Sequence, residues 1–329
     1  MSTANDTPQW LSRPERGSER WLRLMTWLSF KVGRDRARWL LYPIAAWFWL
    51  RTPHARRDSR QYLNRILDHP AGPRDTFAHY LTFAATILDR LYLLRGQREL
   101  FDIEVHGREL LFRHLRDGRG VFMVGAHMGS FESLRVMSRE QQQWQVSMAM
   151  FEDNAQRIGA LLRTIDPKLT EMIVPLGQID SMLKIQARLD RGDMVGFLAD
   201  RSVGNDPVEM VPFLGAPAPF PTGVFRMAAV LRRPVLGIAG LYLGDNRYRL
   251  HFVELADFSN TPRSDRREAI AAAVHTYAAT LESFCREAPL NWFNFFDFWA
   301  PRAQGEAVSN TAAPAASAAT SATPERPRS

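Results

Sequence analysis

The chain has 329 residues, of which 46% are hydrophobic, so it can bury a substantial core in one large domain. Its formal charge of +7 favours anionic partners, and nucleic acid, anionic lipid and an acidic carrier protein all qualify. The single cysteine, Cys285, excludes an internal disulfide and fits a reducing compartment. The eight histidines are scattered, and there is neither a cysteine pair nor a glycine-rich phosphate loop with its lysine. We therefore expect no metal and no other cofactor.

The first 57 residues are expected to hold the chain at a membrane. Residues 1–14 are polar and show no signal-peptide pattern. Residues 15–38 have the pattern of a basic amphipathic helix, and the apolar run that follows, residues 39–50, contains Pro43 and three tryptophans. A membrane-spanning helix needs about 20 apolar residues. This shorter run, with arginines on both sides, predicts a monotopic or re-entrant anchor on an anionic leaflet; a core helix of a soluble protein is the alternative.

Two further helices are expected before the pattern changes. They cover residues 56–69 and 73–95, with Gly96 as a plausible stop for the second. They form a helical lead-in, residues 58–98, to a domain that extends to residue 301. Residues 302–329 consist mainly of Ala, Ser, Thr and Pro, a composition that predicts a disordered tail.

From Phe101 onward, short apolar strands alternate with helices. The expected strands are residues 101–105, 121–124, 146–150, 171–176 and 194–199, and the expected helices between them are residues 108–116, 154–165 and 180–191. This alternation predicts an α/β fold with a mostly parallel central sheet flanked by helices.

The second half of the domain is more varied. The proline-rich residues 202–221 are expected to form an ordered apolar loop, which either lines an acyl-chain tunnel or lies on the surface. The remaining expected elements are a helix over residues 221–233, a hairpin of residues 234–243 and 248–255, a long helix over residues 262–287, and an aromatic box, NWFNFFDFW, at residues 291–299 that tucks against the domain.

The stretch GVFMVGAHMGSFESLR, residues 120–135, carries the candidate chemistry. After the apolar strand, residues 125–129 form a tight turn, and Ser130 can cap the helix that follows. His127 lies on the turn and Glu132 in the first turn of the helix, so the carboxylate can fold back onto the imidazole. A histidine oriented in this way can remove a proton from a hydroxyl. The alternative is a structural histidine beside an acid that suits the helix dipole.

Three polar segments directly follow predicted strands. They are His127, residues 152–154, and Asp200 with Arg201. Because ligands collect beyond the carboxyl ends of parallel strands, we expect these segments to converge on one site.

GAHMGSFE, together with Asn154, Asp200-Arg201 and the aromatic box, resembles the lysophospholipid acyltransferase superfamily. The most similar branch contains the late lipid A (lauroyl/myristoyl) acyltransferases and bacterial relatives thought to acylate other lipids or pigment precursors. The resemblance extends from about residue 15 to residue 299, and its most specific parts are the His-x4-acid (HX4E) motif and the aromatic box. It implies a glycerolipid acyltransferase-like fold in which His127 is the general base and Glu132 its partner.

The candidate substrate-binding residues lie in the later segments: Asn154, Asp200, Arg201, Phe220 and Gly223. The guanidinium of Arg201 suits phosphate, although an ion pair with Asp200 or Asp206 is the alternative. Asn154 can bind substrate or simply cap its helix. Phe220 and Gly223 are the first and last residues of the stretch FPTG. The glycerol-phosphate branch of the superfamily carries Glu-Gly-Thr-Arg at the corresponding place, so a glycerol-phosphate acceptor is not expected.

The resemblance implies a membrane-associated O-acyltransferase at the cytoplasmic face of a bacterial inner membrane, either peripheral or monotopic. The donor would be an acyl thioester of acyl carrier protein or coenzyme A, and the acceptor a hydroxyl of a lipid, glycolipid or pigment-type molecule. Ser130 lacks the Gly-x-Ser-x-Gly elbow of an acyl-enzyme nucleophile, which favours direct transfer. A lipid hydrolase with the same residue pair and a non-catalytic lipid-binding protein are the alternatives. Nucleic acid is not expected, because the arginines cluster with tryptophans beside the apolar run.

Overall fold

The computed structural model describes residues 29–134, 145–151, 167–178, 180–202 and 206–300. A seven-stranded sheet lies at its centre, with the strand order β1-β9-β8-β2-β5-β3-β4. Every neighbouring pair is parallel except β8 and β9, so the predicted mostly parallel sheet is confirmed. The strands are β1 (Asp102–His106), β2 (Val121–Gly125), β3 (Val146–Phe151), β4 (Ile173–Leu176), β5 (Met194–Leu198), β8 (Pro234–Tyr242) and β9 (Arg247–Asp257).

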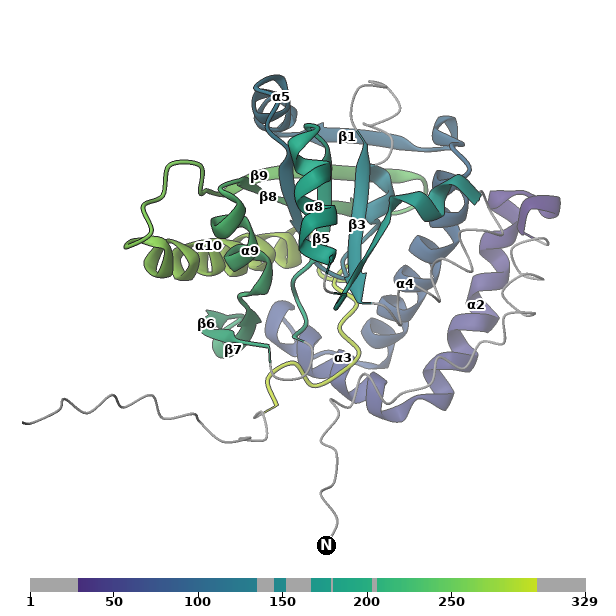
Figure 1. Ribbon diagram of the computed structural model, residues 1–329. Coiled ribbons are helices and arrows are strands. Elements are labelled where there is room, and N and C mark those ends of the chain that lie inside the picture. The colour runs from purple at the N-terminus through teal and green to yellow at the C-terminus, as the bar shows by residue number, and fades with distance from the viewer. Residues whose placement is uncertain (1–28, 135–144, 152–166, 179, 203–205, 301–329) are drawn as a thin grey trace, which may run out of the picture. The chain divides into compact units, whose positions relative to one another are not determined.

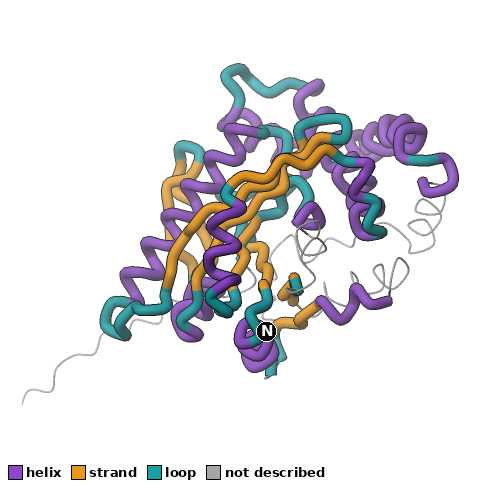
Figure 2. The backbone as a smooth tube through the Cα atoms, turned by 90° about the horizontal axis from the view of Figure 1, so that it is seen from above, coloured by secondary structure: helices purple, strands orange, loops and turns teal. Residues whose placement is uncertain are grey.

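Helices lie on both sides of this sheet (Figures 1 and 2). They are α2 (Arg34–Arg51), α3 (Pro53–Ile66), α4 (Pro73–Leu94), α5 (Arg108–Arg116), α8 (Ser181–Asp190), α9 (Gly223–Leu231) and α10 (Arg266–Glu287), with short 3-10 helices at Arg98–Leu100, Phe131–Leu134 and Pro167–Met172. Three predicted segments lie outside the described residues: the basic helix up to residue 28, the helix at residues 154–165, and the tail beyond residue 300.

Successive side chains of β2 point to opposite faces of the sheet and belong to two separate apolar cores. Phe122 and Val124 point to the face covered by α8, α9 and α10, while Val121 and Met123 point to the face covered by α5. All four side chains are fully buried. β2 is therefore buried on both faces, which is typical of a central parallel strand and explains its continuous apolar sequence.

The expectation of a loop over residues 202–221 is wrong for most of its length. β6 (Val208–Phe213) and β7 (Ala216–Pro221) form an antiparallel hairpin. Leu214 and Gly215 make the turn, with φ values of 49° and 79°. Such positive φ values at both positions define the tight turns preferred by hairpins, and Glu282 holds this turn by accepting a hydrogen bond from the Leu214 amide at 2.7 Å. The prolines suggested a loop. In a two-stranded ribbon, however, proline can occupy positions at the outer edges, where no inter-strand hydrogen bond needs its missing N–H group.

The apolar run of residues 39–50 lies within one continuous helix, α2, in spite of Pro43. Ala37 and Leu41 belong to the same buried cluster as Leu88 and Tyr92 of α4. Away from this contact, α2 exposes several aromatic and aliphatic side chains: Trp39, Tyr42, Trp47 and Leu50. Phe48, near the end of the helix, is also exposed. In the described parts of the chain, no helix is both long and apolar enough to cross a membrane.

A buried ion pair fixes α2 to α4 and to the sheet. Arg34 donates two hydrogen bonds to Asp89 of α4, at 2.8 and 2.9 Å. The hydroxyl of Tyr248 on β9 donates a third to the same carboxylate, at 2.9 Å. Because both charged groups are buried, separating them would leave an uncompensated charge in the interior, which makes the position of α2 specific.

Candidate active site

His127 and Asp200 meet because β2 and β5 are neighbours in the sheet. Gly125 at the end of β2 pairs with Leu198 at the end of β5, and each polar residue lies two positions further along its chain. The imidazole Nδ1 is 2.8 Å from Asp200 Oδ1, and the backbone N–H of His127 donates to Oδ2 at 3.0 Å. The predicted convergence of these two segments is therefore confirmed.

Asp200 is a buried carboxylate with three donors. In addition to the two groups of His127, the indole Nε1 of Trp292 donates to Oδ2 at 3.0 Å. Burial raises the pKa of Asp200, but His127, Arg201 and the Trp292 hydrogen bond outweigh it and hold the pKa well below its usual value. Asp200 is thus ionised at neutral pH and acts as a fixed acceptor.

This acceptor sets the tautomer of His127. Because Nδ1–H donates to the carboxylate, the lone pair of the neutral ring is on Nε2. No described residue forms a hydrogen bond with Nε2, and 35% of the side chain is exposed. Burial of the ring, followed by the charge of Arg201, lowers the pKa of His127 against the opposing effect of Asp200. The ring is therefore neutral and able to accept a proton at neutral pH.

The turn that carries His127 is pinned to β8. Gly129 has a φ of 53°, and a Cβ on it would lie 2.0 Å from the carbonyl oxygen of Gly240. The amide of Ser130 donates to that same oxygen at 2.8 Å. A Cβ on Gly240 would in turn collide with Ser130 and Ser133. Both glycines allow a backbone approach that larger residues would prevent.

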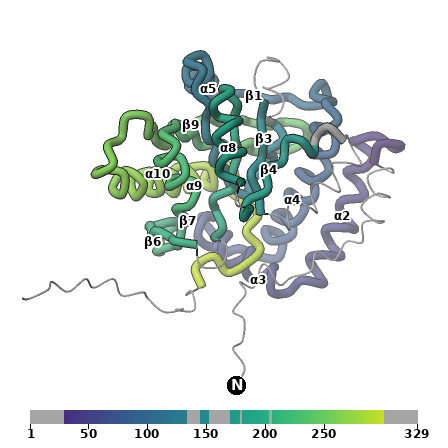
Figure 3. The backbone as a smooth tube through the Cα atoms, viewed as in Figure 1, coloured from purple at the N-terminus to yellow at the C-terminus, as the bar shows by residue number. Residues whose placement is uncertain are grey.

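The aromatic box runs beside the same turn. Phe293 N–H donates to the His127 carbonyl at 2.8 Å, and Gly129 N–H donates to the Asn291 carbonyl at 3.0 Å. Trp292 between them is fully buried and packs on Tyr62 of α3, with ring centroids 5.0 Å apart. The yellow end of the tube in Figure 3 follows this segment past α3. The predicted tucked position is confirmed, and the box supplies backbone and indole groups that hold the site.

Glu132 does not orient His127 in this structure, contrary to the expectation. Its carboxylate forms an ion pair with Arg90 of α4 at 2.6 Å and accepts a longer hydrogen bond from Ser130, at 3.5 Å. The residues after Ser130 form a 3-10 helix, and its contact with α4 directs Glu132 toward that helix instead of back to the imidazole. Asp200, which we expected to bind substrate, holds the ring.

Arg201 lies beside the box. Its guanidinium donates to the Phe293 carbonyl at 3.1 Å and lies 5.1 Å from the centre of the Phe296 ring. Its Nε is buried and has no hydrogen-bond partner. The described residues thus leave one N–H of the guanidinium without an acceptor, and the predicted phosphate role stays a proposal.

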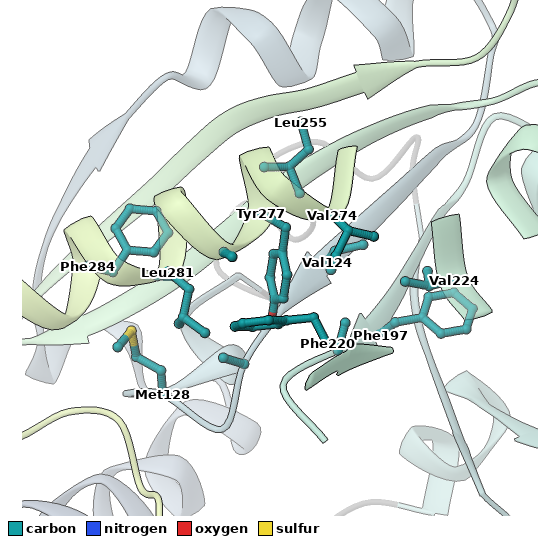
Figure 4. Packing of buried hydrophobic residues seen from close by; sticks show 14 of the residues in the cluster. Val124, Met128, Phe197, Phe220, Val224, Leu255, Val274, Tyr277, Leu281 and Phe284 are labelled. Atoms are coloured by element: carbon teal, nitrogen blue, oxygen red, sulfur yellow. The ribbon is translucent and has the colours of Figure 1, made fainter. Parts of the chain in front are cut away.

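Phe220 lies in the apolar core and Gly223 at the start of a helix. The Phe220 ring is fully buried and packs edge-on against Tyr277 of α10, with centroids 5.8 Å apart (Figure 4). Gly223 is the first residue of α9. Phe220 is therefore a core residue in this structure, while Asn154 lies outside the described residues. The sequence analysis did not single out Arg90 or Trp292. Trp292 belongs to the aromatic box, which was already recognised as specific to the family, and its indole N–H was the available signal for a hydrogen bond to the site.

The fold and the site together define the class of protein. A mostly parallel α/β sheet carries, beyond its strand ends, a neutral histidine locked by a buried carboxylate, which is the arrangement of a general base for a hydroxyl or water. Within the described residues, no cluster of histidine, cysteine and carboxylate groups is arranged to hold a metal ion.

Residues 74–300 match the bacterial lipid A biosynthesis acyltransferase family, and the chain belongs to this family. The matched region runs from the start of α4 to the end of the aromatic box and includes both His127 and Asp200. No curated protein matches the chain. The family makes the protein an acyltransferase and supports the resemblance found in the sequence.

Proposed function

We propose that the protein is a membrane-associated O-acyltransferase that moves a fatty acyl chain from a thioester of acyl carrier protein or coenzyme A to a hydroxyl of a lipid, glycolipid or pigment-type acceptor. The family supports acyl transfer to a lipid. The observation that carries the chemistry is the hydrogen bond from His127 Nδ1 to Asp200, because it leaves Nε2 as a proton acceptor on a partly exposed ring.

The proposed reaction needs no acyl-enzyme. His127 Nε2 takes the proton of the acceptor hydroxyl as its oxygen attacks the thioester carbonyl carbon. The new C–O bond forms, the C–S bond breaks, and the imidazolium returns its proton to the departing thiolate. Asp200 stabilises the imidazolium in between. Arg201, with its free Nε, is proposed to bind a phosphate of the donor or the acceptor.

The outer side of α2 is the proposed contact with an anionic membrane. Trp39 is 76% exposed and Trp47 is also exposed, and both belong to a residue type that prefers the headgroup region. Arg36 and Arg51 are exposed near the two ends of the same helix. A helix with this surface lies on a membrane, which fits peripheral attachment at the cytoplasmic face of a bacterial inner membrane.

The test is acyl transfer from a labelled coenzyme A thioester to lipid extracts, measured beside a thermal melt. His127→Ala should lower turnover by about 10²–10⁴-fold, the usual contribution of a general base, with little change in melting temperature. His275→Ala, which changes an exposed histidine on α10, is the matched control and should keep full activity. Wild-type transfer by folded His127→Ala would refute the proposal.

The products separate this function from the alternatives. Mass spectrometry should find the label in an acylated lipid, whereas a hydrolase would release free fatty acid only. A lipid-binding protein without catalysis would give neither product, and its His127→Ala variant would bind vesicles like the wild type.

A further inference from the structure

Helix α4 has one face that neither α2 nor the sheet covers. Phe83, Ile87 and Arg90 follow the i, i+4, i+7 spacing and therefore lie along one side of the helix. Leu88 and Tyr92, which pack on α2, lie on roughly the opposite side. Phe83 and Ile87 are each 38% exposed, so two large apolar side chains stand open on this face.

Both ends of the open face are tied to the candidate active site. At one end, Phe83 packs on Phe293 with ring centroids 5.0 Å apart, and the Phe293 amide donates to the His127 carbonyl. At the other end, Arg90 forms its ion pair with Glu132. Ile87 lies between them. The apolar strip thus meets the segment that carries His127 at both ends, through Phe293 beside Phe83 and through Glu132 beside Arg90.

Arg90 retains hydrogen-bonding capacity. One terminal nitrogen is paired with Glu132, and its side chain is partly exposed, but its Nε is buried and without a hydrogen-bond partner. The charge of Arg90 is also among the causes that lower the pKa of His127, which is consistent with a position near the imidazole. A partly exposed cation, held by a carboxylate five residues after the histidine, is suited to a substrate oxygen that gains negative charge.

We propose that this open face of α4 binds the acyl thioester, with the alkyl chain over Phe83 and Ile87 and the carbonyl oxygen accepting a hydrogen bond from Arg90. The inference rests on the proposed function and adds a place for the donor to it. Phe83 and Arg90 are seven residues apart, so the face is roughly 10 Å long between their Cα atoms. An extended acyl chain fits such a narrow apolar strip, and the polar end of that chain is its carbonyl.

The role of Arg90 follows from where charge develops. When the acceptor oxygen attacks, the carbonyl π electrons move onto the carbonyl oxygen, which becomes an oxyanion beside the guanidinium. They return as the C–S bond breaks and the thiolate leaves. Arg90 would therefore bind the transition state more strongly than the neutral thioester, and its loss should lower kcat more than it raises KM.

The first experiment tests the alkyl chain. Ile87→Trp fills the open face, and Val230→Trp, at an exposed apolar position on α9, is the matched control. With octanoyl-, dodecanoyl- and hexadecanoyl-coenzyme A as donors, Ile87→Trp should lower kcat/KM for the longest chain by about tenfold or more relative to the shortest, a usual size for apolar-pocket discrimination. The control should keep the wild-type order. An unchanged order in Ile87→Trp, or a loss of vesicle binding alone, would overturn the proposal.

The second experiment tests Arg90. Arg90→Gln should lower kcat by about 10²–10³-fold, as the loss of an oxyanion donor does, and added guanidinium should restore part of the rate. Arg90→Lys keeps the charge beside Glu132 and decides the question if Arg90→Gln does not fold. It should be slow as well, because an ammonium cannot reproduce the guanidinium geometry. If both variants have wild-type kcat while His127→Ala is inactive, this inference fails and the proposed function stands.

Discussion

Asp200 shows how three donors can fix the chemistry of a neighbouring residue. One carboxylate holds the ring and the backbone of His127 and the indole of Trp292. His127 was predicted from the sequence to be the base, but Asp200 was not predicted to be its partner. Spacing along the chain pointed to Glu132, five residues away. The actual contact depends on β2 lying next to β5, and strand order cannot be read from apolar periodicity.

The Asp200→Asn variant tests this contact. Asp200 raises the pKa of His127, so its loss should lower that pKa further, and the acid limb of kcat/KM should move to lower pH. Turnover should nonetheless fall by about 10²–10⁴-fold, because the amide no longer fixes the tautomer or stabilises the imidazolium. Rates measured from pH 4 to 8 would show both effects. Asp180→Asn, at the exposed start of α8, is the control; a shift of the limb to higher pH would contradict the assignment.

At the scale of elements, the sequence predicted most helices and strands of the described chain. The hairpin of β8 and β9 was expected because a Gly-Asp-Asn turn separates two apolar runs. The hairpin of β6 and β7 was not, because its prolines resemble a loop. What makes it a hairpin is tertiary packing. The Phe213 and Phe220 rings pack edge to face with centroids 5.3 Å apart; Phe220 also packs on Tyr277 of α10, and Phe213 on Trp292 of the aromatic box.

Helix α2 carries the prediction for membrane contact. Replacing Trp39 and Trp47 together by Glu should weaken binding to phosphatidylglycerol vesicles by well over tenfold, because each buried aromatic side chain contributes about 1.5–3 kcal/mol. The melting temperature should hardly change, since both side chains are exposed. The matched control is Leu183→Glu, which changes an exposed apolar side chain on α8. Sedimentation with vesicles measures the effect, and equal loss in both variants would argue against a specific role for α2.

At the scale of the whole molecule, His79 of α4 connects α3 to the aromatic box. It donates Nε2–H to the Trp292 carbonyl at 3.0 Å, while Nδ1 accepts from Ser59 of α3 at 2.8 Å. It also stacks on Phe295, with centroids 4.7 Å apart. This role could not be predicted from the sequence, because a lone histidine on a helix can serve many purposes until its neighbours are known.

His79 should make the fold sensitive to acid. Burial lowers its pKa from 6.5 to about 4, so the unfolded chain takes up a proton on this residue more readily than the folded protein. Its contribution to stability is complete above about pH 6.5 and is lost as the pH falls toward 4, by up to about 3 kcal/mol. Urea unfolding of the wild type and His79→Gln at pH 7 and pH 4.5 measures it. The variant should lose less stability between the two pH values; equal losses would contradict the assignment.

The order of synthesis along the chain determines when all the bonds around His127 can form. A ribosome has finished His127 and Asp200 long before it reaches Asn291, Trp292 and Phe293, yet those three residues supply bonds to Gly129, Asp200 and His127. A nascent or truncated chain that ends before residue 291 holds the base and its carboxylate without these bonds. The last bonds around the base therefore form only after nearly the whole folded part of the protein has been synthesised.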